Sequence, residues 1–172
     1  MKTMTRANAR ELAVHLIYSQ SFTGDEPRDL IALRLEKEYY QKLSEDNEIY
    51  DQSPNSFQRA YIDSVVSGVA NRSEDLNELI QKFAIGWDVS RISRLARTIM
   101  QLAIYEILYV EDVPTGVAVS EAVRLAKKYD GDDTGAFVNG ILGSYVRARN
   151  TEAEAPVEEA PAQMPAAETE EV

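Results

Sequence analysis

Apolar residues recur at helical spacing through most of the first 150 residues of the chain. In the first such segment they follow the i, i+3, i+4, i+7, i+8 pattern of one buried helical face: Ala9, Leu12, Ala13, Leu16 and Ile17. Similar spacing predicts further helices over about 30–43, 54–69, 73–83, 93–109, 116–129 and 135–149. No segment alternates with the period of two that indicates a strand. The pattern predicts an all-α protein of about seven helices, packed as two helical subdomains over about 1–72 and 73–150.

Residues that favour helix ends separate these segments. Ser53 is suited to cap a helix that Pro54 opens, because proline at the first helical position loses no hydrogen bond that the helix needs. Ser73 is expected to cap the next helix. Residues 131–134, a glycine followed by two aspartates and a threonine, predict a turn and an N-cap for the last helix.

The overall composition is typical of a globular protein. Hydrophobic residues make up 44% of the 172 positions and charged residues 27%. The absence of cysteine excludes disulfides and any thiolate metal site or nucleophile. No apolar run approaches the roughly 18 residues that would span a bilayer, and no apolar signal segment follows the basic N-terminus. We therefore expect a cytoplasmic protein with no membrane segment.

The net charge of -11 is concentrated at the C-terminus. Residues 151–172 contain seven glutamates and no lysine or arginine, whereas the first 150 residues carry 22 acidic and 18 basic residues, a net charge of -4. This C-terminal segment is rich in glutamate, alanine and proline and lacks aromatic residues, which predicts disorder. It is interpreted as a solvating appendage or as a segment that screens a basic RNA site. The acidic balance disfavours a general nucleic-acid binder but leaves a local basic patch open.

The residues offer little for catalysis. The only histidine, His15, lies well away from the centre of its helix's apolar face and is expected in solvent. Asp132 and Asp133 lack the ligand spacing of a calcium loop, so helix capping explains them better than a metal site. We expect no catalytic residue, no metal and no cofactor.

Several basic residues lie near the N-terminus. Lys2, Arg6 and Arg10 occur at steps of four before any acidic residue. On a helix the two arginines flank the apolar stripe, so both guanidiniums are expected at its solvent edge, where they suit phosphate oxygens or base edges. The alternative is an ordinary exposed helix start, although cations there are unfavourable.

Two residues inside apolar surroundings are expected to be structural. Trp87 is expected to anchor the core between the two subdomains, since Ala84, Ile85 and Val89 lie close to it in sequence. Glu106 lies inside an apolar helix, and a buried unpaired carboxylate costs several kcal/mol, so we expect it to pair with an arginine or to lie at a helix edge. Arg97 and Arg124 are the candidate partners.

The start of the last helix holds a third set of candidates. Phe137 is interpreted either as a core residue or as a platform on which an unpaired base stacks. Asn139 is suited to hydrogen-bond a base edge or nearby backbone. Gly140 costs about 1 kcal/mol of helix stability relative to alanine, which predicts close approach of another helix.

Five segments together carry a resemblance to a known family. They read RANARELAV at 6–14, WDVSR at 87–91, AIYE at 103–106, VAVSEAVRLAKKY at 117–129 and FVNGIL at 137–142. In this order and spacing the chain resembles the NusB family of transcription antitermination factors over residues 1–150. The resemblance implies an all-α fold of two subdomains and binding to boxA RNA of nascent ribosomal RNA transcripts. It further implies pairing with NusE, a ribosomal small-subunit protein, within the antitermination complex of RNA polymerase.

The resemblance also implies roles for particular positions. With Asn139 added, the candidate RNA-binding residues are Lys2, Arg6, Arg10, Asp133, Phe137 and Asn139. Tyr18 and Phe22, near the end of the first helix, would face or border NusE. The first helix has fewer arginines than is common in the family, and Gln101 replaces a frequent arginine, so fewer phosphate contacts are expected.

The sequence leaves alternatives open for the function and for the oligomeric state. The protein is either an RNA-binding factor or mainly a scaffold that holds NusE with little RNA affinity of its own. A NusB-like domain also precedes the catalytic domain of some ribosomal RNA methyltransferases, but this chain has no glycine-rich cofactor loop and no cysteine nucleophile. The sequence leaves monomer and homodimer equally open.

Overall fold

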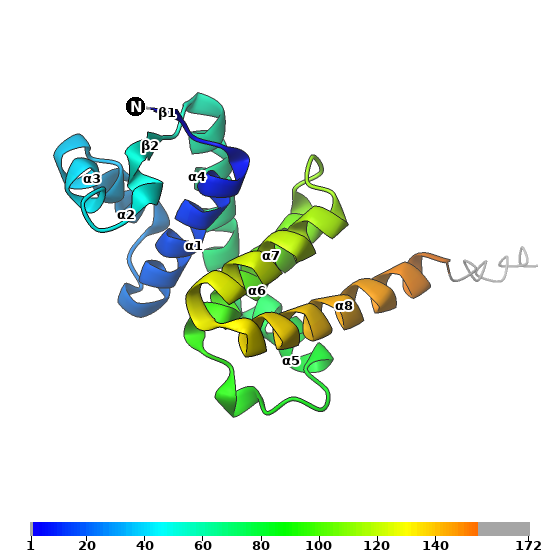
Figure 1. The fold of residues 1–172 in the computed structure, drawn as a ribbon. Helices are drawn as coiled ribbons and strands as arrows, with labels where there is room; N and C mark the ends of the chain where they lie inside the picture. Colours follow the sequence, from blue (N-terminus) through cyan, green and yellow to red (C-terminus); the bar gives the residue numbers. More distant parts are fainter. Residues whose placement is uncertain (1, 155–172) are drawn as a thin grey trace, which may run out of the picture.

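The computed structural model describes residues 2–154, which form a helical protein with one very small sheet (Figure 1). Its α-helices are α1 (Arg6–Thr23), α2 (Pro27–Arg34), α3 (Lys37–Leu43), α4 (Ser56–Asn71), α5 (Ser73–Phe83), α6 (Arg94–Tyr109), α7 (Thr115–Asp130) and α8 (Asp132–Glu154). The remaining elements are strands β1 (Lys2–Thr3) and β2 (Gln52–Ser53) and the 3-10 helices η1 (Glu48–Asp51) and η2 (Val89–Arg91). The all-α prediction is confirmed, with eight α-helices in the described residues where about seven were expected.

Helix α6 forms the centre of the core. It packs against α1, α4, α5, α7 and α8. Every residue from 98 to 106 is buried, because apolar residues surround α6 through its middle turns. The predicted subdomain boundary near residue 72 falls between α4 and α5 and stays a prediction.

The first half of the chain differs from the sequence prediction at several helix ends. The single helix expected over 30–43 is two helices, because Glu36 adopts extended backbone and its carboxylate accepts hydrogen bonds from the first turn of α3. Asn55, rather than Ser53, caps α4 through a capping box with Gln58. Ser73 is the first residue of α5, which lacks a side-chain cap. Local propensity identified the breaks before α4 and before α5 but missed the break between α2 and α3 and the residues that act as caps.

The start of α4 and the small sheet also differ from what the spacing of residues suggests. Phe57 precedes the buried residues Tyr61, Val65 and Val69 at steps of four, yet it is 83% exposed and lies in the first turn of α4. Strands β1 and β2 pair in parallel, with Lys2 opposite Gln52. Two residues per strand are too few to produce an alternating pattern.

Helices α7 and α8 form a tight antiparallel pair. Gly131, at a φ of +93°, joins them in a backbone conformation that favours glycine. Asp132 and Asp133 lie in the first turn of α8, where negative charge is favourable. Helix α8 starts earlier than predicted and continues to Glu154, so residues 151–154 are helical and not disordered; residues 155–172 lie outside the described part. In residues 2–154, no helix is long and apolar enough to cross a membrane.

Candidate nucleic-acid interface

Arg6 lies at the exposed start of α1. Thr5 caps this helix by accepting a hydrogen bond from the Asn8 amide. The Arg6 side chain is 41% exposed, its guanidinium lies 4.4 Å from the centre of the Tyr61 ring, and one guanidinium nitrogen is 3.1 Å from Asp112 Oδ2. Asp112 is more exposed than Arg6. The pair is therefore a surface ion pair that solvent and salt screen, and Arg6 stays within reach of an anion.

Arg10 lies in the core, and the expectation that it would stand at the solvent edge was wrong. Its side chain is 4% exposed and makes a bidentate ion pair with the equally buried Glu106, with nitrogen–oxygen distances of 2.8 and 2.9 Å. Glu121 lies 3.5 Å from the same guanidinium. Burial alone would lower the pKa of Arg10, but its hydrogen bond to Glu106 and the charge of that carboxylate raise it, so Arg10 stays charged.

The same ion pair identifies the partner of Glu106. An arginine was expected, and Arg10 takes that role in place of Arg97 or Arg124. Because the two residues are far apart in sequence, the helical wheel of α1 gives no indication that a carboxylate from α6 meets Arg10. The physical reason for the burial of Arg10 is therefore tertiary.

Glu11 forms a second polar centre between α1 and α7. Its carboxylate accepts hydrogen bonds from Lys128, at 2.7 Å, and from the hydroxyl of Tyr129, and Arg124 lies 3.9 Å away. Burial would raise the pKa of Glu11, but these donors outweigh burial and lower it. The side chain is buried and ionised, so it fixes α1 beside the C-terminal half of α7.

His15 belongs to the same polar layer, and its predicted exposure to solvent was wrong. Its Nδ1 lies 3.0 Å from the hydroxyl of Tyr50 and its Nε2 2.8 Å from that of Tyr129. Arg34 donates a hydrogen bond to Tyr50. Burial, with the nearby positive charges of Arg34 and Lys128, lowers the pKa of His15 to about 4, against an opposing effect of Glu11. The imidazole is neutral at pH 7 and works as a structural hydrogen-bonding group.

Lys2 lies in a cleft at the N-terminal end of the molecule. The cleft has a volume of about 560 Å³ and also contains Lys128 and Asn8. Three carboxylates line it as well, from Glu11, Glu48 and Asp51. Its charge is therefore mixed, and a phosphate there would meet Lys2 and Lys128 beside nearby carboxylates.

The start of α8 presents an exposed polar surface next to an aromatic pair. Asp133 and Asn139 are exposed, and Phe137 is half-buried, with its ring centre 5.9 Å from that of Trp87. Trp87 was expected in the core but is 45% exposed, since it lies in the loop between α5 and α6 and covers the outer side of α8. A Cβ at Gly140 would lie 3.3 Å from the Trp87 ring, so the close approach predicted at Gly140 comes from this loop and not from another helix.

The two aromatic residues expected near NusE lie together at the end of α1. The rings of Tyr18 and Phe22 have centres 4.9 Å apart and meet edge to face. Phe22 is 59% exposed, and the guanidinium of Arg94 lies 4.2 Å from its ring centre. Arg94 also donates a hydrogen bond to the Ser21 carbonyl. An aromatic pair with one exposed ring, held in place by an arginine, is a typical anchor for a protein partner.

The candidate RNA-binding residues therefore fall in two groups. Arg6 lies near the start of α7, as its contact with Asp112 shows, whereas Lys2 shares a cleft with Lys128 of the last turn of α7, and Asp133, Phe137 and Asn139 follow that end. A 16-residue helix such as α7 is about 24 Å long, which sets the scale of their separation. Sequence reasoning did not consider Lys128, which lines the cleft with Lys2 and whose position depends on its contact with Glu11 of α1.

Comparison with known proteins places this fold in a family. A family model described as the NusB family matches residues 7–147. The chain belongs to the NusB family. The resemblance predicted from the sequence is thereby confirmed, and it covers the helices that build both the α1–α7 junction and the start of α8.

Individual NusB proteins agree with this assignment. A transcription antitermination protein NusB from Acetivibrio thermocellus is 40% identical over 146 residues, which cover 85% of this chain and 91% of that protein. The structure of T. maritima NusB has a TM-score of 0.65 at 27% identity and covers 85% of this chain and 93% of its own. The structure of antitermination factors NusB and NusE in complex with double-stranded RNA has a TM-score of 0.64 at 23% identity, covers 83% of this chain and 96% of its own, and shows a shared fold.

Proposed function

We propose that this protein is a transcription antitermination factor that binds boxA-type RNA of nascent ribosomal RNA transcripts together with NusE. In this role it joins the antitermination complex and supports elongation by RNA polymerase. It acts in the cytoplasm, by binding and without catalysis. The observation that carries the proposal is membership of the NusB family over residues 7–147, together with relatives named as transcription antitermination proteins.

On this proposal the RNA crosses the molecule beside α7. Arg6 contacts a phosphate near the start of α7, Lys2 contacts one at the cleft that it shares with Lys128, and Asp133, Phe137 and Asn139 contact the RNA after the end of α7. The exposure of Arg6 and the partial exposure of Phe137 support these assignments. Arg10, which was included among the RNA contacts from the sequence, instead holds α1 against α6 and so supports Arg6 from within the core.

NusE is proposed to bind where Tyr18 and Phe22 meet. The ring of Phe22 is exposed although Arg94 already lies against it, so a partner that covers this surface would bury an apolar ring without rearranging the helix. The complex of NusB with NusE and double-stranded RNA, built on the same fold, agrees with such a pairing.

The test is a titration of labelled boxA RNA with this protein, alone and with equimolar NusE, at two salt concentrations. We expect sequence-selective binding that strengthens when NusE is present and weakens as salt rises, because phosphate contacts release counterions. A scrambled RNA of the same length is the control for selectivity. Equal affinity for both RNAs in the presence of NusE would overturn the proposed function.

A pair of double variants locates the RNA surface. Lys2→Ala with Arg6→Ala should weaken RNA binding and reduce the slope of log affinity against log salt by about two, one for each lost phosphate contact. The matched control is Lys37→Ala with Lys42→Ala, which removes the same charge from exposed positions on α3. Equal slopes for the two variants would place the RNA elsewhere.

One observation favours a second candidate, a scaffold that holds NusE with little RNA affinity of its own. The cations between α1 and α7 already face carboxylates: Arg6 faces Asp112, Arg10 faces Glu106, and Lys128 faces Glu11. Capture of NusE at high salt without RNA, combined with RNA binding too weak to depend on Lys2 and Arg6, is the result that favours this reading.

A further inference from the structure

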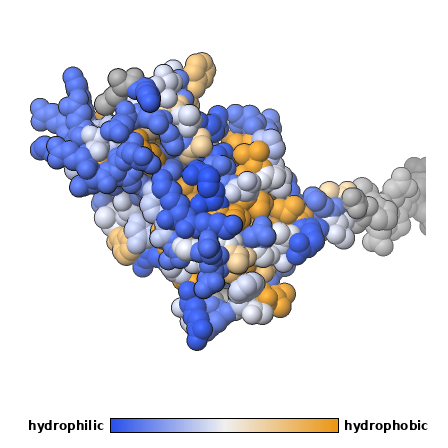
Figure 2. Space-filling model, viewed as in Figure 1, coloured by the Kyte–Doolittle hydropathy of each residue, from blue (hydrophilic) through white to orange (hydrophobic). Residues whose placement is uncertain are grey.

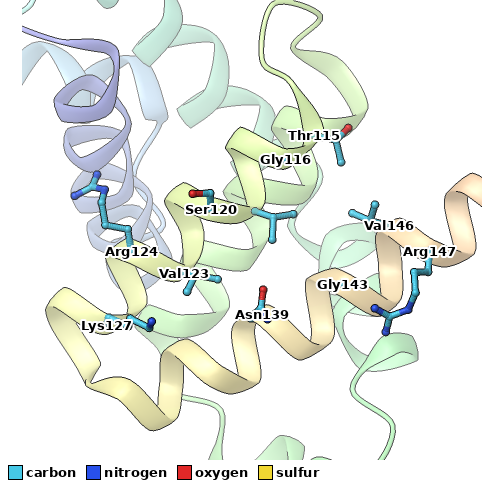
Figure 3. Close-up of a pocket in the computed structure, with 11 residues that line it drawn as sticks. Thr115, Gly116, Ser120, Val123, Arg124, Lys127, Asn139, Gly143, Val146 and Arg147 are labelled. Carbon is cyan, nitrogen blue, oxygen red and sulfur yellow. The ribbon is translucent and has the colours of Figure 1, made fainter.

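A groove between α7 and α8 shares only Asn139, whose side chain points into it, with the candidate interface described above (Figure 3). Its volume is about 780 Å³, and none of its lining residues is acidic. Half-buried valines from both helices, Val119, Val123 and Val146, form its apolar part. In the space-filling view, hydrophobic surface lies between α7 and α8 with hydrophilic residues beside it (Figure 2).

Cations border this apolar surface without internal compensation. Lys127 of α7 and Arg147 of α8 form no ion pair with any residue of the described part, 2–154. Arg147 only donates a weak hydrogen bond to Ser144, at 3.2 Å. Arg124, at the α1 side of the groove, is held by Glu121. An occupant that combines carboxylates with small apolar side chains therefore fits better than a phosphate backbone, which would leave the valines uncovered.

The chain itself supplies such a segment. Residues 155–172 contain five glutamates, no cation, and three separated apolar side chains larger than alanine or proline, Val157, Met164 and Val172. We propose that this C-terminal segment docks in the α7–α8 groove of its own chain, with its glutamates facing Lys127 and Arg147 and its apolar side chains against the valines.

The connection is short enough for this docking. The segment follows Glu154 at the end of α8, and from there the groove extends back to Asn139, a distance of about 22 Å along the helix. Eighteen residues of extended chain reach about 60 Å, well beyond this distance. Tethering gives an effective concentration in the millimolar range, so even a weak contact is populated.

Paramagnetic relaxation in the full-length chain tests the proposal directly. The chain has no cysteine, so Ala162→Cys gives one site for a nitroxide label. We expect selective broadening of the amide signals of Val119, Val123, Asn139 and Gly143, and no comparable broadening in α2 or α3. The variant with Lys127→Glu and Arg147→Glu should lose this broadening. Lys37→Glu with Lys42→Glu, which changes the net charge by the same amount, should keep it.

Three results would overturn the proposal. One is groove amides that broaden no more than those of α3. Another is equal broadening in both charge-reversal variants. The third is broadening that appears only when labelled and unlabelled chains are mixed, which would assign the groove to the C-terminal segment of a second copy. If the groove variant fails to fold, the native sequence gives the same test, because broadening due to docking must fall between about 50 and about 500 mM salt.

Discussion

The two long sides of α7 use their cations differently. On the side that faces α1, Lys128 and Arg124 meet Glu11 and Glu121, and Arg10 of α1 meets Glu106 from α6. On the side that faces α8, Lys127 and Arg147 have no carboxylate partner in the described residues. The first side is a structural junction and the second is an available surface. Counting cations along the sequence therefore does not measure how much charge a ligand can reach.

The strongest way to test the contrast is to remove one cation from each side. Arg10→Met should lower the free energy of unfolding by about 3–5 kcal/mol, because it leaves Glu106 buried without its principal partner. Arg147→Met removes an exposed cation and should change stability by about 0.5 kcal/mol or less. Urea unfolding of the two variants measures the difference.

A double variant separates charge from shape at this junction. Replacing both partners, Arg10→Met with Glu106→Leu, should recover much of the lost stability, since no unpaired carboxylate remains at position 106. Equal stability of Arg10→Met and Arg147→Met would mean that the buried pair contributes no more than a surface charge, and the contrast between the two sides would fail.

The next largest effect is expected from pH on the α1 side. The pKa of His15 is about 4 in the folded protein, below its ordinary value of 6.5. The unfolded chain therefore binds a proton more readily, so stability is full above pH 6.5 and falls as the pH drops from 6.5 toward 4. The loss approaches about 3 kcal/mol at the lower end.

His15→Gln isolates this contribution. Because His15 is the only histidine and the carboxylates titrate at lower pH, the native chain should lose stability between pH 6.5 and 5 while the variant stays nearly level. The comparison uses urea unfolding at several pH values. If the free energy of unfolding changed with pH in the same way for both proteins, the pKa of His15 would not be lowered by burial in this junction.

The sequence predicted the features that depend on the residues of a single helix and missed the contacts that depend on a second helix. The apolar spacing of Leu12, Leu16 and Ile17 identified α1 and its buried face correctly. The same spacing placed Arg10 and His15 outside that face, because it contains no information about Glu106 or Tyr129. Because α6 and α7 supply these partners, burying Arg10 and His15 costs less free energy than burying them without a partner would.

Loops account for most of the remaining errors. Trp87 looked like a core residue because apolar residues surround it in sequence, yet it reaches α8 from a loop and stays half exposed. The split between α2 and α3 was missed because neither glycine nor proline marks it, and Glu36 provides the cap. At the start of α8, Phe137 and Asn139 were candidates from their residue types, with core or backbone roles as the alternatives, whereas Asp133 was named from family resemblance alone.

On the proposed RNA path, Phe137→Ala should weaken boxA binding by about 1–3 kcal/mol if one base stacks on this ring. The matched control is Tyr39→Ala, an exposed aromatic residue on α3. Trp87 is the only tryptophan and lies against Phe137, so its fluorescence reports the same event. Two results together would exclude this end of α7 from the RNA path. They are an RNA affinity of Phe137→Ala equal to that of the native protein, and a Trp87 fluorescence that does not change when RNA binds.

The smallest effect should come from the exposed ion pair at the other end of α7. Asp112→Asn releases Arg6 from its carboxylate and removes a negative charge, so on the proposed function RNA affinity should rise a few-fold at low salt and return to the native value at high salt. Stability should change by no more than about 1 kcal/mol, because the pair is exposed to solvent. Asp75→Asn makes the same change of charge at an exposed position on α5. A rise in affinity for Asp112→Asn alone would show that a surface pair can be opened toward a ligand, whereas an equal rise in both variants would reduce the effect to net charge.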